Sequence, residues 1–130
     1  MILAPAVIVH GLPDALAALR PGRAVTLLSA RGAAGYAGVL WWRELVAAAR
    51  AVHPAAAARD VLDCAAAPGH AMAALRGGQR LLVLDGDCPG FAAVAGAAAT
   101  LGAQVLPAAP PALDLADTGA RRRLAGWLVG

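Results

Sequence analysis

Two short segments of this chain place an aspartate directly before a cysteine: Asp63-Cys64 and Asp85-Gly86-Asp87-Cys88. A cysteine thiolate is a strong nucleophile, and neighbouring carboxylates transfer protons or bind Mg²⁺. The adjacent aspartates work against a reactive thiol, because a like charge raises the pKa of the cysteine. A buried, unreactive cysteine is the commoner outcome for a free thiol.

A cysteine nucleophile also needs a base within hydrogen-bonding reach, and His10 and His70 are the candidates. The sequence therefore offers Cys64, Cys88 and His10 as candidate catalytic residues. The same two cysteines with His10 and His70 have the ligand types of a zinc site, but their spacing matches no compact zinc-binding motif, so we expect no metal site.

Polar residues follow several of the apolar runs of the chain, at the points where strands would end. In open α/β sheets, ligands bind outside the carboxyl ends of the strands. Glycine in such loops lets a ligand approach backbone N–H groups at a helix start, and arginine pairs with an anion through two hydrogen bonds. The predicted ligand-binding residues are His10, Ser29, Arg31, Gly32, Gly35, Asp63, Asp85 and Asp87.

Several mechanisms are excluded by residue types. The chain has no lysine, so its eleven basic residues are all arginines, and Schiff-base chemistry, lysine-anchored pyridoxal phosphate and Walker-type nucleotide hydrolysis are ruled out. The segment Arg31-Gly32-Ala33-Ala34-Gly35 matches neither the dinucleotide nor the P-loop pattern. The acidic strand ends are similar to those of phosphorelay receiver domains, but His10-Gly11 stands where their acidic pair belongs. We do not expect phosphoryl acceptance, and the sequence names no cofactor.

The elements that must position these residues follow from short branched-apolar runs that alternate with helical stretches. The predicted strands are Pro5–Val9, Ala24–Leu28, Val61–Leu62, Leu81–Leu84 and Gln104–Leu106. The predicted helices are Asp14–Arg20, Tyr36–Val52, His70–Arg76, Phe91–Leu101 and about Thr118–Leu128. Pro21-Gly22, His53-Pro54 and Gly77-Gly78 stand where helices should stop.

Strands that alternate with helices imply parallel pairing through right-handed crossovers. Five such units predict a three-layer, doubly wound, flavodoxin-like α/β fold, with a partial βα barrel as the alternative. The length of 130 residues predicts a single domain over residues 1–130.

Two helices lead us to expect self-association, as a twofold dimer. In the helix Tyr36–Val52, we predict that Trp41, Leu45, Ala48 and Val52 face the sheet. That arrangement leaves Val39, Trp42 and Val46 on an exposed apolar flank. The helix 91–101 carries no charge on any side, and a small domain cannot easily bury such a helix on all sides without a partner chain.

Composition limits the partners and the location. Alanine makes up roughly a quarter of the chain, which together with arginine in place of lysine is typical of a GC-rich, bacterial-type coding background. The net charge of +3 is small, and only five residues are aromatic. Arg121-Arg122-Arg123 is therefore interpreted as a solvated helix face, and nucleic-acid binding is not expected.

The mean hydropathy of +0.65 comes largely from alanine, and prolines and glycines interrupt the longest uncharged run, so we expect no membrane span. We also expect a cytoplasmic protein with reduced cysteines.

Three functional hypotheses follow. The first is a non-catalytic binding or regulatory module that holds a small anionic ligand, or a partner, at the strand ends. The second is a small enzyme that depends on Cys64 or Cys88. The third is a structural homo-oligomer in which the apolar helices matter most.

Overall fold

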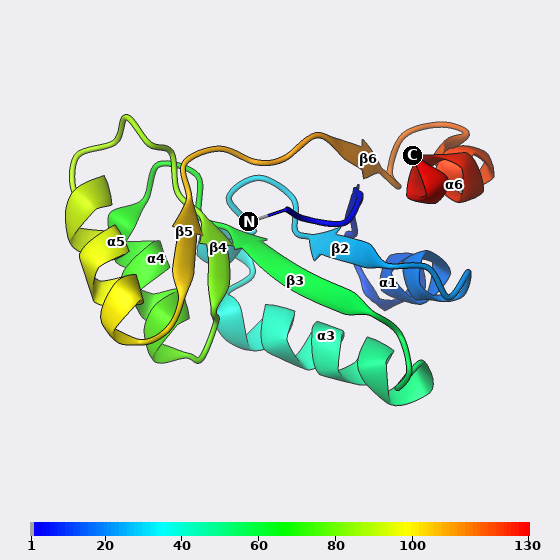
Figure 1. The fold of residues 1–130 in the computed structure, drawn as a ribbon. Helices are drawn as coiled ribbons and strands as arrows, with labels where there is room; N and C mark the ends of the chain where they lie inside the picture. Colours follow the sequence, from blue (N-terminus) through cyan, green and yellow to red (C-terminus); the bar gives the residue numbers. More distant parts are fainter. Residues whose placement is uncertain (1) are drawn as a thin grey trace. The chain divides into compact units, whose positions relative to one another are not determined.

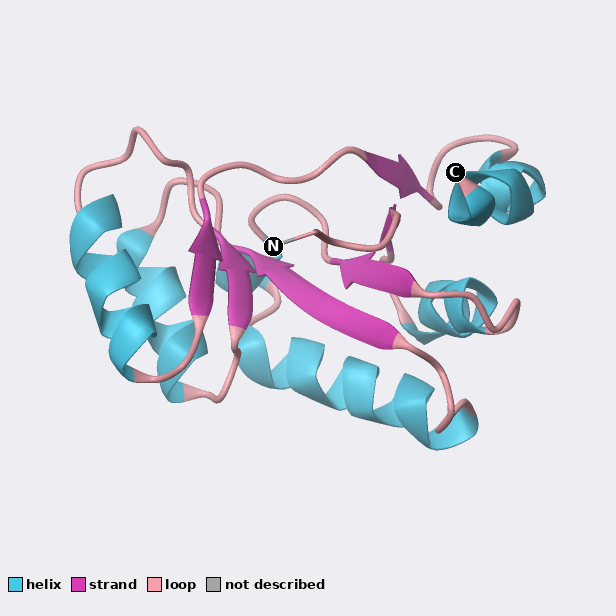
Figure 2. Ribbon diagram, viewed as in Figure 1, coloured by secondary structure: helices cyan, strands magenta, loops and turns pink. Residues whose placement is uncertain are grey.

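The computed structural model describes residues 2–130, in which strands and helices alternate (Figures 1 and 2). The strands are β1 (Ala6–Ile8), β2 (Val25–Leu28), β3 (Ala58–Asp63), β4 (Leu81–Val83), β5 (Gln104–Leu106) and β6 (Ala112–Asp114). The helices are α1 (Leu12–Leu19), α2 (Ala33–Tyr36), α3 (Val39–Val52), α4 (Pro68–Arg76), α5 (Phe91–Thr100) and α6 (Ala120–Val129).

The six strands form one parallel sheet in the order β5-β4-β3-β2-β1-β6. This confirms the predicted α/β class and is consistent with a flavodoxin-like fold. The strands β5 and β6 are the two edges of the sheet. Among the helices of residues 2–130, none is both long enough and apolar enough to cross a lipid bilayer.

The five predicted strands all form, but the sequence interpretation missed β6 and α2. The strand β6 has three residues, which is too few to show a hydrophobic period, and it follows Pro110-Pro111, which read as a turn. In the structure β5 is followed directly by β6, with no helix between the two strands. The predicted fifth strand–helix unit is instead β6 followed by α6.

The chain divides into two compact units, and the first contains the chain through Leu28, Glu44–Asp60 and Pro110–Gly130. In this unit β1 lies between β2 and β6, and Ile8 is level with both Leu28 and Asp114. Helix α6 buries Ala120, Leu124 and Leu128, which lie on one face because they are four residues apart. The indole Nε1–H of Trp127 donates a 2.7 Å hydrogen bond to the Ala6 carbonyl, which ties α6 to β1.

The second unit contains Ser29–Arg43 and Val61–Ala109. Here β4 lies between β3 and β5, and Asp63 is level with Val83. Helices α4 and α5 lie side by side in this unit (Figure 1). Only Val94 and Ala98 of α5 are buried, so most of this uncharged helix is solvent-exposed within the single chain. The prediction of one domain over residues 1–130 stays a prediction.

The predicted orientation of α3 is wrong for four residues. Trp42 and Val46 were expected on an exposed flank, but their exposed fractions are 0% and 1%. Ala48 and Val52, which were expected to face the sheet, are both exposed, Val52 by 60%. The reason is that α3 is apolar over more than half of its circumference, so the sequence allows two overlapping stripes, and the buried one is Trp42, Leu45, Val46 and Ala49.

Candidate functional site

The predicted ligand-binding residues divide between the two compact units. His10 belongs to the first unit, and the other seven belong to the second. In the second unit, hydrogen bonds join Ser29, Arg31, Gly32, Asp63 and Asp85 in two groups, which we call the Arg31 cluster. In the first unit, hydrogen bonds join His10, Asp14, Asp114 and Arg121, which we call the His10 cluster.

Asp63 ends β3 and is only 3% exposed. Its Oδ1 atom accepts hydrogen bonds from the backbone N–H groups of Ala65 at 2.7 Å and Gly32 at 3.3 Å. Its own N–H donates to the Ser29 hydroxyl oxygen at 2.9 Å. These bonds connect the loop after β2 to the end of β3, so Asp63 and Ser29 stabilise the local structure independently of any ligand.

Two residues around Asp63 have backbone conformations that favour glycine. Gly32, which precedes α2, has a φ of 73°, and Ala65 has a φ of 51°. Ala65 is the one residue other than glycine with positive φ among residues 2–130. The left-handed conformation of an alanine costs about 1–2 kcal/mol, which the two bonds to the Asp63 carboxylate help to offset.

Arg31 and Asp85 form an ion pair through two hydrogen bonds, Nη1 to Oδ1 at 3.1 Å and Nη2 to Oδ2 at 2.7 Å. The Arg31 side chain is 66% exposed and that of Asp85 is 23% exposed. The hydrogen bond from Arg31, together with the charge of its guanidinium, lowers the pKa of the Asp85 carboxyl below its ordinary value against the opposing effect of desolvation. The same bond raises the pKa of Arg31, so both groups are charged at neutral pH.

Asp85 lies two residues beyond Val83, which is level with Asp63, so the alternation of side chains along a strand directs Asp85 and Asp63 to the same face. Asp87 lies in the same loop, is exposed and adds a weaker electrostatic effect on Arg31. The cluster and Asp87 together hold three carboxylates against one guanidinium, so the local charge is negative.

Gly35 has a packing role. A Cβ atom on this residue would lie 2.7 Å from Cε1 of His70, which means that the imidazole on α4 packs directly on the backbone of α2. Gly35 lies inside α2 and not at the start of the helix, so the expected place for a ligand at its backbone N–H is not formed there.

The two cysteines differ in environment. Cys64 is buried, and burial, with a smaller effect of Asp63, raises the pKa of its thiol to about 12. Such a thiol is protonated at neutral pH and is a poor nucleophile. Cys88 is half-buried, and both cysteines are free thiols. Within residues 2–130, no three histidine, cysteine or carboxylate side chains are arranged to hold a metal ion.

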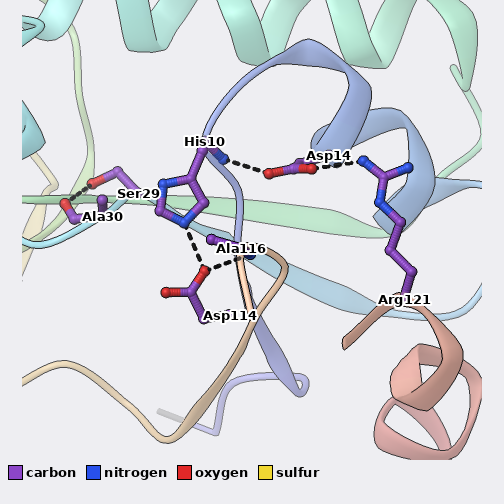
Figure 3. A network of polar contacts seen from close by, with 7 residues as sticks. All are labelled: His10, Asp14, Ser29, Ala30, Asp114, Ala116 and Arg121. Carbon is purple, nitrogen blue, oxygen red and sulfur yellow. Dashed lines mark hydrogen bonds and ion pairs between the residues drawn. The ribbon is translucent and has the colours of Figure 1, made fainter. Parts of the chain in front are cut away.

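The His10 cluster joins the ends of β1 and β6 (Figure 3). His10 Nε2–H donates a 2.6 Å hydrogen bond to Asp114 Oδ1, which also accepts the Ala116 N–H at 2.9 Å. The His10 backbone N–H donates to Asp14 Oδ2 at 3.0 Å, and Arg121 Nη2 donates to the other oxygen of Asp14 at 2.7 Å. Desolvation raises the pKa of Asp114, but the hydrogen bonds from Ala116 and His10 outweigh it, so the pKa is lowered overall.

The pairing of His10 with Asp114 follows from the strand register. Ile8 is level with Asp114, and His10 lies two residues beyond Ile8, so both side chains leave the sheet on the same face. The sequence interpretation missed Asp114, Asp14 and Arg121. Recognition of β6 would have placed Asp114 among the strand-end residues.

An apolar hollow of about 530 Å³ lies at the opposite, amino ends of β1 and β6 in the first unit. Its lining includes Pro5, Pro110, Pro111 and Trp127, and none of the predicted ligand-binding residues. The hollow therefore does not belong to either polar cluster.

Comparison of the chain with models of known protein families, with characterised protein sequences and with solved structures found no match.

Proposed function

We propose that the Arg31 cluster of this chain is a non-catalytic binding or regulatory site that holds a small anionic ligand through the guanidinium of Arg31. The observation that supports it is the exposed, two-bond pair of Arg31 with Asp85. The planar fork of an arginine fits a phosphate or carboxylate ligand as well as it fits an aspartate. An anionic ligand would thus take the place of the Asp85 carboxylate on Arg31.

The exchange has a low energetic cost. Arg31 is two-thirds exposed, and an exposed ion pair contributes only about 0–1 kcal/mol to stability. A ligand that makes the same two hydrogen bonds therefore needs little binding energy to displace Asp85. Because Asp63 and Asp87 make the surroundings negative, an anion that merely adds to the cluster is disfavoured. The ligand must replace Asp85, which makes Asp85 a competitor that tunes the affinity.

Inorganic phosphate tests this proposal. We expect sodium phosphate to raise the melting temperature of the wild-type protein above that in sodium chloride of equal ionic strength. When the phosphate concentration is ten times its dissociation constant, binding raises the free energy of unfolding by about 1.4 kcal/mol. The Asp85→Asn variant, which lacks the competing charge, should reach the same shift at a lower phosphate concentration, and Arg31→Gln should lose it.

The matched control is Arg59→Gln, since Arg59 is an exposed arginine of the first unit. This variant should respond to phosphate as the wild type does. An Arg31→Gln protein that phosphate still stabilises as strongly as the wild type would show that the anion binds elsewhere. An Asp85→Asn protein with unchanged or weaker phosphate dependence would exclude the exchange.

The second candidate function is a structural homo-oligomer. Helix α5 favours it, because the helix carries no charge and buries only Val94 and Ala98 within the chain. The cysteine-dependent enzyme has less support, since the Cys64 thiol is protonated at neutral pH. We further propose a cytoplasmic location, for which the two free thiols are the support.

A further inference from the structure

The strands β1 and β6 meet at the point of the first unit where the chain order reverses. The strand β1 has β2 on one side and the last strand, β6, on the other. Reversals of this kind in parallel sheets open a crevice at the carboxyl ends of the two strands, where ligands bind. His10 and Asp114 are the side chains at those two ends, and they are 36% and 31% exposed.

From this geometry we infer that His10 and Asp114 form a nucleophilic dyad that accepts the acyl group of a small, neutral, activated acyl compound. The Asp114 carboxylate can only accept a hydrogen bond, so the ring proton of His10 lies on Nε2. The lone pair is then on Nδ1, which makes no hydrogen bond among residues 2–130. His10 is the group that would touch the substrate, and Asp114 is a positioning residue.

The dyad is held from both sides. On the side of β6, the Ala116 N–H donates to the same Asp114 oxygen that accepts the imidazole proton, which orients the carboxylate. On the side of β1, Asp14 accepts the backbone N–H of His10 and is itself bonded by Arg121. Neighbours that fix the orientation of a reactive side chain in this way increase the rate of its reaction with a bound substrate.

The charges of the His10 cluster favour a neutral substrate. The guanidinium of Arg121 is already bonded to Asp14, and Asp114 is ionised, since its pKa is lowered. A phosphoryl substrate, which brings several negative charges, would face two carboxylates here. An acyl carbon with a good leaving group needs only a nucleophile and a group that stabilises the cation formed.

The chemical step is as follows. The Nδ1 lone pair of His10 forms a bond to the carbonyl carbon, and the bond from that carbon to the leaving oxygen breaks with its electron pair on the oxygen. The acylimidazolium that results carries one positive charge, which the Asp114 carboxylate stabilises through the Nε2 proton. Water then adds to the acyl carbon, the carbon–nitrogen bond breaks with its electron pair on Nδ1, and a carboxylic acid and one proton leave.

The test uses the full chain and diethyl pyrocarbonate, an activated acyl compound that modifies histidine. The chain has three histidines, so His53 and His70 are internal references, and His70 is exposed like His10. Peptide mass spectrometry at short times gives the three modification rates. We expect His10 to react at least about ten times faster than either reference, a threshold below the roughly 100-fold minimum that a positioned acid or base typically contributes.

The Asp114→Asn variant should bring the His10 rate down to that of His70, whereas Asp114→Glu should restore part of it. Asp117→Asn, a change at an exposed aspartate of the same loop, should leave all three rates unchanged. Unchanged rates at His53 and His70 in each variant show that the fold is intact. Across the wild type and these variants, the rate at which p-nitrophenolate is released from p-nitrophenyl acetate should rise and fall with the rate of His10 modification.

Two results would overturn the inference. One is equal modification of His10 and His70 in the wild type, because exposure alone would then explain the reactivity. The other is an Asp114→Asn protein whose His10 rate is unchanged relative to the two references. Neither result bears on the Arg31 cluster, whose test measures phosphate-dependent stability.

Discussion

Burial and a neighbouring carboxylate together keep the Cys64 thiol protonated. With a pKa of about 12, the thiolate fraction at pH 8 is about one in ten thousand. We predict that iodoacetamide at pH 8 alkylates Cys88 at least about 100 times faster than Cys64 in the native protein. Peptide mass spectrometry before and after denaturation measures both rates.

In the denatured chain the two thiols should react at similar rates, which is the control for this prediction. If Cys64 were alkylated first in the native protein, the cysteine-dependent enzyme would regain support. Because burial is the larger cause of the raised pKa of Cys64 and the adjacent Asp63 the smaller one, the Asp-Cys pairs of the sequence do not by themselves distinguish the two cysteines.

Ala65 provides a second test at the residue scale. Its φ of 51° is unfavourable for any side chain with a Cβ atom, whereas glycine adopts it without strain. The gain on substitution is reduced by the larger backbone entropy of glycine in the unfolded chain. We predict that Ala65→Gly raises the free energy of unfolding by about 0.5–1 kcal/mol, as measured by urea denaturation.

The neighbouring Ala66 is the matched control, because it is exposed and has no positive φ. Ala66→Gly should lower the free energy of unfolding by a few tenths of a kcal/mol, about what glycine costs where no strain is relieved. A loss of stability in Ala65→Gly equal to that in Ala66→Gly would mean that the Ala65 backbone stores no strain.

At the scale of elements, α3 distinguishes two adjacent tryptophans. Their ring centroids are 5.9 Å apart, but Trp42 is fully buried and Trp41 is only partly buried. We predict that Trp42→Phe lowers the free energy of unfolding by about 1–3 kcal/mol and that Trp41→Phe lowers it by less than about 1 kcal/mol. Urea denaturation followed by circular dichroism measures both changes.

The same pair tests the corrected orientation of α3. A Trp42 that lay on a dimer surface would give a destabilisation that varies with protein concentration, because dissociation and unfolding would be coupled. We expect the effect of Trp42→Phe to be independent of concentration. An equal loss of stability in the two variants would contradict the burial difference.

At the scale of the whole molecule, self-association stays a prediction, and α5 is the surface that carries it. Most of this helix is exposed, and it has no charge to keep two copies apart. We predict that the protein sediments as a dimer at micromolar concentration. Ala93→Glu, which adds a charge to the exposed side of α5, should shift the equilibrium to the monomer.

Ala125→Glu is the control, since Ala125 is exposed on α6 and the change adds the same charge. This variant should sediment as the wild type does. A wild-type chain that sediments only as a monomer would remove the structural-oligomer hypothesis and would leave the anion-binding proposal unaffected.

The alternation of strands and helices was predictable because its signals are local. Branched-apolar runs and proline or glycine punctuation stand within a few residues of each boundary, and all five predicted strands form. The rule that parallel strands end at a common edge likewise indicated Arg31, Asp63 and Asp85, which the second unit brings into the Arg31 cluster and its surroundings. The missed strand, β6, is too short to leave such a signal.

The sequence by itself thus determined the α/β class, the absence of lysine chemistry and all five residues of the Arg31 cluster. Tertiary structure alone decided that Arg31 pairs with Asp85, that His10 pairs with Asp114 across β1 and β6, and which stripe of α3 is buried. The physical reason is that pairing and register depend on contacts between segments far apart in the chain. A residue two positions beyond a strand acquires its partner only when the neighbouring strand is in place.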